Sequence, residues 1–471
     1  MSYSKMRSAT PYSTALVALS ICMGAIADDD EGHMHHDAPV EFHPINGGSK
    51  TFHWILTLAL LLLMPSVSSA LAFGNKLHWS LFLQFILTGY LVVESLFLDF
   101  PDNSDNHENR TSKGTSWFLS LLLGATVFMG SFINGSNLVI NKFYPHLSTR
   151  GQYGITYKIY KTLSFLVVLT GWVRVCMAPV ALFGFCYGIH TGQCIAHGIM
   201  GSSFIFYGFV LAFVLVIPWI RQHSNPNINS DPSRRSQEFY DSSLMCLWGI
   251  VNTFTEHRWG REGWSHGDYQ HTAMGIIWWC GGLIGMWLTR KNNARSFVPA
   301  LLLIFTGYGM SQHAQHLEIS TKVHAMFGLA LMGGGFSRII EILFVLQDKG
   351  SSDSGKILSF QHMPPFCLIL AGVLFMSANE EQLKLVNDLG ADHSAYILVV
   401  TGAAFIIYLW MLLLLSLYLH LVGYDENGEL GLGPNSNYQN INTNDAEEFE
   451  LGDLSEGETD EPSRSPTANQ Q

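Results

Sequence analysis

The sequence has few charged residues and no surplus of positive charge. Only 13% of its 471 residues are Asp, Glu, Lys or Arg, and the formal net charge is −12. A nucleic-acid-binding protein needs a Lys/Arg-rich face that neutralises phosphates, so we expect no nucleic-acid partner. So small a charged share, beside 48% apolar residues, also excludes an ordinary soluble enzyme.

The negative charge that is present lies at one end of the chain. Residues 424–471 hold twelve acidic residues and one arginine, which account for −11 of the −12. With few apolar side chains, this stretch cannot offset the entropy cost of folding, so 423–471 is predicted to be a disordered, acidic cytosolic tail. Tyr438–Ile441 has the form of a tyrosine-based sorting signal and Ser455 precedes acidic residues. Sorting proteins and kinases are therefore candidate partners of the tail.

Long apolar runs dominate the rest of the sequence. A single segment satisfies its backbone polar groups inside lipid only as a helix. Eleven segments are candidate membrane-spanning helices: 52–73, 78–99, 116–140, 159–184, 195–220, 242–256, 269–289, 297–312, 322–346, 364–382 and 394–421. We predict an all-α polytopic protein surrounded by the lipid bilayer. Its two fused bundles would be a five-helix domain over 52–220 and a six-helix domain over 242–422, joined by a cytosolic linker over 221–241.

The N-terminus and the positive charges predict an orientation. Residues 1–27 resemble a secretory signal peptide, because Lys5 and Arg7 precede an apolar run that ends in small residues. With the mature N-terminus outside, the inner loops hold thirteen Lys or Arg residues and the outer segments hold seven. We therefore expect an integral protein of the endomembrane system or plasma membrane. It would have a lumenal His-rich segment over 28–51 and an N-glycosylated Asn109 in an outer loop.

Two of the seven cysteines share one expected outer loop. Cys186 and Cys194 would lie in an oxidising compartment and could close a small ring, so a structural disulfide is predicted between them. The cysteines inside the spans are expected to be small apolar packing residues.

The histidines are unevenly distributed in the predicted topology. Fifteen of the twenty lie toward the outer side and five toward the inner side. In the C-terminal half, five of them reach the outer ends of neighbouring helices: His257, His271, His313, His316 and His324. Imidazoles with carboxylates nearby suit Zn, Fe or Cu, so these five are candidate metal ligands.

Three functions could use these histidines. Imidazoles that hold a b-type haem or a transition metal would make a transmembrane electron carrier, and His53 with His197 is a candidate haem pair in the N-terminal half. Zinc with an open coordination position would make a membrane hydrolase. In a metal-free transporter or scaffold, the same histidines would only cap helices or bind lumenal water.

A few ionisable residues lie within the apolar segments. Charges at such depth are costly, and they are usually paired or functional. Arg338 and Glu341 have the i,i+3 spacing of a pair on one helix, and Glu94 with Arg174 is a plausible pair between two helices. Structural pairing is the favoured interpretation of both.

Several motifs resemble those of the YTP family of fungal polytopic membrane proteins. They are Asn252–Gly260, Asp268–Thr272, Thr321–Gly328, and Gly333–Gly335 followed by Arg338 and Glu341. The resemblance covers residues 40 to 422. It implies a helical membrane fold with a separate C-terminal domain, an N-terminal domain similar to the cytochrome b ferric reductase group, and a link to electron transport. It carries over His257, His271 and His324 as motif histidines.

Overall fold

The computed structural model describes residues 47–97, 107–143, 154–183, 185–186, 190–223, 235–255, 257, 263–264, 266–291, 294–312, 317–346 and 357–424. Within these ranges the chain is helical and contains no β-strand, which confirms the all-α prediction. All eleven expected spans fall on helices. The predicted signal peptide, the tail from residue 425 onward, His313 and His316 lie outside the described residues.

The first five expected spans give the following elements, in chain order. They are α2 (Gly47–Leu58), the π-helical turn η1 (Ala59–Leu63), α3 (Met64–Phe73), α4 (Leu77–Phe97), α5 (His107–Phe143), α6 (Ile155–Cys176), α7 (Ala178–Phe183), α8 (Thr191–Val216) and α9 (Pro218–His223). Helix α5 starts nine residues before the expected span at 116, so Asn109 lies in this helix and not in a loop.

The last six expected spans give the C-terminal elements. They are α10 (Gln237–Thr255), α11 (His266–Leu288), α12 (Val298–Ser311), α13 (Glu318–Ile340), the π-helical turn η5 (Glu341–Leu346), the 3-10 turn η6 (Ser359–His362), α14 (Met363–Met376), α15 (Glu380–Asp388) and α16 (His393–Val422). Helix α10 starts five residues before the expected span at 242, and this brings Glu238 and Asp241 into the helix.

The lengths and surfaces of the helices fit a polytopic membrane protein. Eight helical segments within the described ranges are long and apolar enough to cross a membrane. Among the expected spans, α10, α11 and α12 are outside this group, and α12 is apolar but has only 14 residues. The total of eleven crossings thus stays a prediction. Large apolar side chains such as Phe128 (71% exposed) and Phe344 (72% exposed) point away from the core, as expected for a surface that lipid covers.

The described residues up to Val422 form one compact unit. Its largest apolar cluster joins Phe204 of α8, Phe327 of α13, Phe375 of α14 and Tyr408 of α16. Helix α8 packs against α14, and α16 contacts α3, where Nε1 of Trp410 donates a hydrogen bond to Ser66. The predicted division into two bundles at residue 220 stays a prediction.

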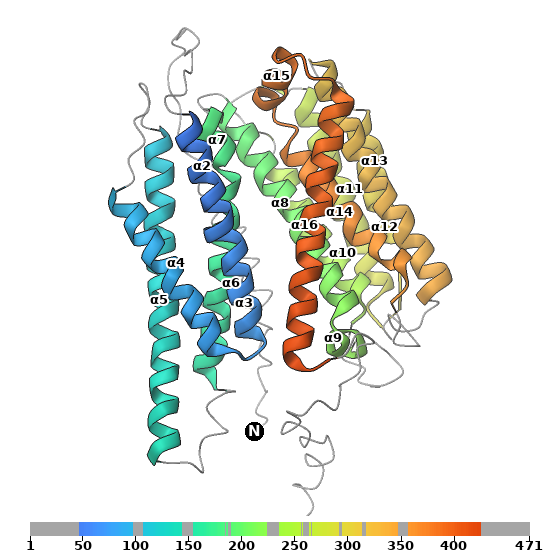
Figure 1. The fold of residues 1–471 in the computed structure, drawn as a ribbon. Coiled ribbons are helices and arrows are strands. Elements are labelled where there is room, and N and C mark those ends of the chain that lie inside the picture. Colours follow the sequence, from blue (N-terminus) through green and yellow to red (C-terminus); the bar gives the residue numbers. More distant parts are fainter. Residues whose placement is uncertain are drawn as a thin grey trace, which may run out of the picture. The chain divides into compact units, whose positions relative to one another are not determined.

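The long helices of this unit run between two ends. Figure 1 shows α15 at one end of the long helices and α9 at the other, and we call them the α15 end and the α9 end. The N-terminal parts of α8, α11 and α13 meet at the α15 end, which brings a histidine from the second turn of each helix close to the others. The start of α10 and the end of α13 meet at the α9 end.

Helices α8 and α14 approach each other closely through two glycines. A Cβ atom on Gly201 would lie 2.6 Å from the carbonyl oxygen of Gly372, and one on Gly372 would lie 2.5 Å from the carbonyl oxygen of Gly201. Small residues at such crossings let two membrane helices pack backbone to backbone. The space between α8 and α14 is therefore filled by the helices themselves.

Candidate metal centre

Two buried histidines lie next to each other at the α15 end. The ring centroids of His197 in α8 and His324 in α13 are 6.1 Å apart, with 55° between the ring planes. Their exposed fractions are only 8% and 4%. Phe375 of α14 packs edge-on against His197, with 4.6 Å between the centroids. Helix α8 and the later helices α13 and α14 thus build one site.

A backbone hydrogen bond fixes the tautomer of His324. Its Nδ1 lies 2.8 Å from the carbonyl oxygen of Ser320, one turn earlier on α13. A carbonyl oxygen can only accept, so Nδ1 carries the proton and Nε2 of the neutral ring keeps its lone pair. Metal-binding histidines usually have this arrangement, in which the second ring nitrogen donates to a carbonyl or carboxylate.

His197 has a buried nitrogen that is not hydrogen-bonded, and a third histidine lies nearby. Among the described residues, no hydrogen-bond partner reaches Nδ1 of His197. Such a buried polar atom costs free energy unless a ligand or water satisfies it. His271 of α11 is close enough to interact electrostatically with both His197 and His324. The side chain of Asn252 donates a hydrogen bond of 2.9 Å to the backbone oxygen of His271 and so ties α10 to the start of α11.

The structure brings together only some of the predicted metal ligands. His271 and His324 join His197, whereas His257 has other partners. Nδ1 of His257 lies 3.2 Å from Oδ2 of Asp268, and its ring stacks on Trp264 with 4.1 Å between the centroids. No three His, Cys, Asp or Glu side chains within the described ranges surround one point closely enough to hold a metal ion. The site is therefore a pair of imidazoles with a third nearby.

His53, the predicted haem partner of His197, lies in a different cluster. Its Nε2 is 3.9 Å from Oε1 of Glu94, and this carboxylate is ion-paired with Arg174, which confirms the predicted pair between helices. Ser116 also donates a hydrogen bond of 3.0 Å to Glu94. The Arg174 guanidinium lies over the ring of Trp54, 5.6 Å from its centroid. These contacts give the buried charges a structural role.

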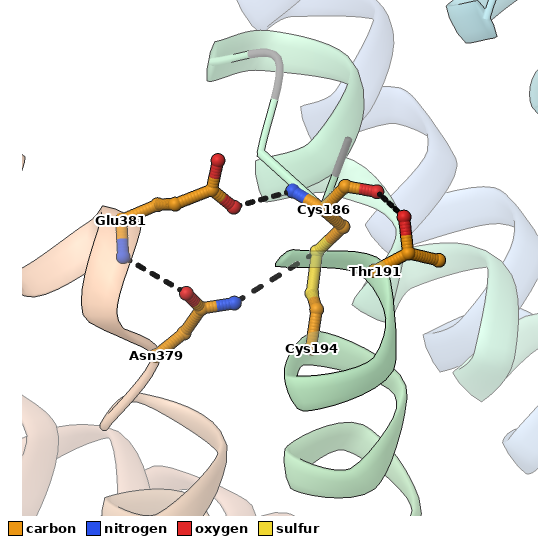
Figure 2. Close-up of a disulfide and its surroundings, with 5 residues drawn as sticks. All are labelled: Cys186, Thr191, Cys194, Asn379 and Glu381. Atoms are coloured by element: carbon orange, nitrogen blue, oxygen red, sulfur yellow. Dashed lines mark hydrogen bonds between the residues drawn. A yellow bond between two sulfur atoms is a disulfide. The ribbon is translucent and has the colours of Figure 1, made fainter. Parts of the chain in front are cut away.

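A disulfide joins Cys186 and Cys194 at the start of α8, three residues before His197 (Figure 2). The backbone N–H of Cys186 donates a hydrogen bond of 2.6 Å to the carboxylate of Glu381, and Asn379 donates to the Cys186 sulfur at 3.8 Å. Asn379 also caps α15 by accepting from the backbone N–H of Glu381. These contacts fasten the loop before α8 to the start of α15.

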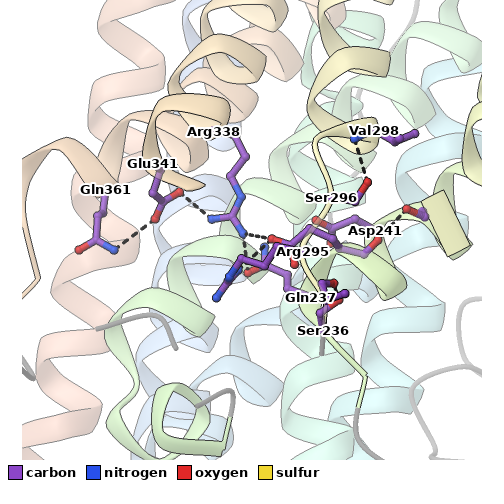
Figure 3. Close-up of polar contacts among 12 residues, drawn as sticks. Ser236, Gln237, Asp241, Arg295, Ser296, Val298, Arg338, Glu341 and Gln361 are labelled. Atoms are coloured by element: carbon purple, nitrogen blue, oxygen red, sulfur yellow. Dashed lines mark hydrogen bonds and ion pairs between the residues drawn. The ribbon is translucent and has the colours of Figure 1, made fainter. Parts of the chain in front are cut away.

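The predicted pair of Arg338 and Glu341 is confirmed, with 2.6 Å between Nη1 and Oε2. It is part of a larger cluster at the α9 end, in which Glu238 binds both Arg338 and Arg295 (Figure 3). Arg295 is one of the thirteen positive charges of the predicted inner loops. Nothing in its local sequence indicates a buried partner.

Sequence reasoning also missed two neighbours of the histidine pair, Ser320 and Phe375. Ser320 lies four residues before His324, and this spacing on a predicted helix could have indicated the hydrogen bond to the ring. Phe375 is one of many apolar residues in its span, and no signal in the sequence distinguishes it. The pairing of His197 with His324 depends on which helices are neighbours, and this order is not contained in a hydropathy pattern.

Comparisons with known proteins agree with the helical membrane fold. Residues 170–419 match a family model described as Protein YTP1-like, C-terminal. Protein YTP1 of Saccharomyces cerevisiae is 53% identical over 419 residues, covering 88% of each chain. The uncharacterized membrane protein C3B8.06 of Schizosaccharomyces pombe is 25% identical over 267 residues, covering 48% of this chain and 52% of its own.

A further relative is the uncharacterized membrane protein YCR061W of Saccharomyces cerevisiae, which is 28% identical over 180 residues and covers 33% of this chain and 28% of its own. No solved structure matches the chain. The family model includes His197, His271 and His324 in its matched range. On the extent of these matches, the chain belongs to the YTP1-like family of membrane proteins.

Proposed function

We propose that this protein is a transmembrane redox protein that binds a copper or iron ion through His197 and His324, with His271 as the third ligand. The observation that carries the proposal is the buried imidazole pair itself. His324 has its Nδ1 proton held by Ser320, and His197 has a buried Nδ1 without a described partner. Imidazole suits both metals, and a bound ion of either would supply one-electron chemistry.

The third ligand requires a side-chain movement. His197 and His324 already lie side by side, whereas His271 is near them without completing a three-residue metal site. His271 is only partly buried, in contrast to His197 and His324. In this proposal its imidazole turns toward the pair when the ion binds.

The burial of the site favours electron transfer over hydrolysis. A zinc hydrolase must admit its substrate and keep a coordination position open for water. His197 and His324 are nearly inaccessible, and Phe375 packs directly against His197. Electrons, unlike a substrate, can reach a metal through packed protein, so low exposure is compatible with a redox role.

The packing also favours an ion over a haem. A porphyrin needs a wide slot between the helices that carry its ligands. Between α8 and α13, which carry His197 and His324, the rings of Phe204 and Phe327 pack against each other with 5.8 Å between their centroids. The ring of Phe327, 4.8 Å from Phe375 between centroids, fills the adjacent space. His53 lies beside Glu94 and His197 beside His324, and these contacts do not favour a haem shared by the two histidines.

Elemental analysis of the purified full-length protein tests the proposal. Wild-type protein loaded with copper or iron and then dialysed should retain metal, and His197→Ala and His324→Ala should each lower the metal content to background. His362→Gln is the matched control. His362 is also a part-buried helix histidine, but it lies far along the chain from the pair and bonds Tyr408 through Nδ1 at 2.7 Å.

Two results would count against the proposal. Equal metal content in the wild type and the His324→Ala variant would remove the imidazole pair as the binding site. Retention of zinc alone, with no spectral response to dithionite, would favour the hydrolase alternative. Size-exclusion elution of each variant checks that it remains folded.

A further inference from the structure

Charged side chains from distant parts of the chain gather at the α9 end (Figure 3). Oε1 of Glu238 accepts hydrogen bonds from Arg295 and Arg338, both at 2.9 Å. Arg338 also donates to Oε2 of Glu341 at 2.6 Å, and the side-chain amide of Gln361 donates to Oε1 of Glu341 at 3.2 Å. The cluster links α10, the segment before α12, the end of α13 and η6.

Without Asp241, this cluster holds equal numbers of positive and negative charges. Two guanidinium groups face the carboxylates of Glu238 and Glu341. Burial disfavours the charge of Glu238, but the positive charges of Arg338 and Arg295 outweigh it and hold the pKa of Glu238 below its ordinary value. Asp241, one turn further along α10, adds a third carboxyl. If it is ionised, the cluster carries a surplus negative charge, which is costly where the dielectric constant is low.

Within the described residues, Asp241 bonds to a hydroxyl group and to no cation. The hydroxyl of Tyr207 in α8 donates a hydrogen bond to its carboxyl. Asp241 precedes the segment expected to cross the membrane at 242 and lies outside the eight candidate spans. Burial, and then the negative charge of Glu238, raise the pKa of Asp241 to about 7, although Tyr207, Arg338 and Arg295 act in the opposite direction.

We propose that Asp241 is a proton-binding site filled from the water at the α9 end. A proton from water forms an O–H bond on the carboxyl, and its release returns the proton to water, so the step needs no other reactant. A proton requires only one acceptor oxygen. Ca²⁺ or Mg²⁺ would need about six oxygen ligands, and the two nearby guanidinium groups would repel it. This inference does not rest on the proposed metal site.

The position of Asp241 lets proton binding affect how the helices are held. Once ionised, Asp241 competes with Glu238 and Glu341 for the guanidinium groups of Arg338 and Arg295. Glu341 is also the first residue of η5, and π-helical turns of this kind are frequent at functional sites. A small cavity lined by Arg338, Glu341 and Gln361 borders the cluster. Proton release would therefore loosen the contacts between α10 and α13.

Infrared difference spectroscopy of the full-length protein in lipid vesicles tests this site. As the pH is raised, the C=O band of a protonated carboxyl should disappear with a midpoint near pH 7. This band should be missing in Asp241→Asn. In Tyr207→Phe the midpoint should move up by about one pH unit, because the hydroxyl stabilises the ionised carboxylate. The control Asp388→Asn, at an exposed carboxyl of α15, should behave as the wild type.

The proposal fails if the titrating band persists unchanged in Asp241→Asn. It also fails if Tyr207→Phe leaves the midpoint where it is, a readout that remains available should the Asp241 variant not fold. A midpoint that follows the sodium concentration would assign the site to a metal cation instead of a proton.

Discussion

At the scale of single residues, Arg174 shows how a charge is kept among apolar helices. Its side chain is fully buried. It is ion-paired with Glu94, and its Nη1 donates a hydrogen bond of 2.8 Å to the hydroxyl of Thr115. Removing one partner of a buried pair is costly because the other charge then stays buried without compensation.

We expect Glu94→Gln to lower the free energy of unfolding by about 3–5 kcal/mol, because Arg174 loses its counter-charge. The double variant Glu94→Gln/Arg174→Met, which removes both charges at similar volume, should recover most of this loss. Chemical unfolding of the purified protein in detergent measures both effects. A single variant as stable as the wild type would show that the pair does not hold the N-terminal helices together.

The sequence predicts some of these side-chain pairs and not others. Few ionisable residues lie within the apolar segments, so the sequence predicts an ion pair between Glu94 and Arg174. The cluster around Glu238 was not predicted, because this residue was assigned to a linker that α10 in fact enters. Polar residues can extend a helix beyond the lipid, and a hydropathy pattern does not detect that extension.

At the scale of the elements, the first membrane segment departs from a regular α-helix at η1. Pro65 has no N–H group to donate to the carbonyl of Leu61, four residues earlier. That carbonyl instead lies against Gly171 of α6, where an added Cβ atom would come within 1.9 Å of its oxygen. The carbonyl that Pro65 leaves without its helical donor thus meets Gly171, where a residue without a side chain fits. The proline and the glycine are more than a hundred residues apart in the sequence.

Gly171→Ala should therefore lower the free energy of unfolding by about 1–3 kcal/mol, since the new methyl group meets backbone that cannot rotate away. Gly124→Ala on α5 is the matched control. A Cβ atom there meets nothing within 4 Å, and alanine is the better helix former, so its stability should be unchanged or slightly higher. Thermal unfolding that shifts equally in both variants would contradict the close contact between η1 and α6.

The positions of the elements were largely predictable because apolar runs of this length have few alternatives to a helix in lipid. Which elements lie next to each other was not predictable from these runs. Topology alone brings His197, His271 and His324 to the same end, but which of them touch depends on the glycine crossings that set α8 against α14 and α12 against α13. The predicted haem pair of His53 and His197 stays a prediction, and the described contacts place His53 beside Glu94 and His197 beside His324.

At the scale of the whole molecule, the two proposed sites lie at opposite ends of the long helices. The histidine pair is at the α15 end and the ionic cluster is at the α9 end. The distribution of Lys and Arg predicts that the α15 end faces the lumen or the cell exterior and the α9 end faces the cytosol. Asn109, near the start of α5, belongs to the same side as the histidine pair in this topology.

Glycosidase treatment should increase the gel mobility of the wild-type protein expressed in a eukaryotic cell, and Asn109→Gln should abolish this shift. A tag after residue 471 should be accessible to protease only after the plasma membrane is permeabilised. An accessible tag on intact cells, together with an unglycosylated Asn109, would invert the topology and place the histidine pair in the cytosol.

In the proposed site, buried imidazoles hold a redox-active metal. X-ray absorption at the edge of the metal bound to the full-length protein tests it most directly, because one sample reports both the ligands and the oxidation state. We expect scattering typical of two or three histidine ligands, and an edge that shifts to lower energy after dithionite reduction. A metal without histidine scattering, or an edge that reduction leaves in place, would contradict it.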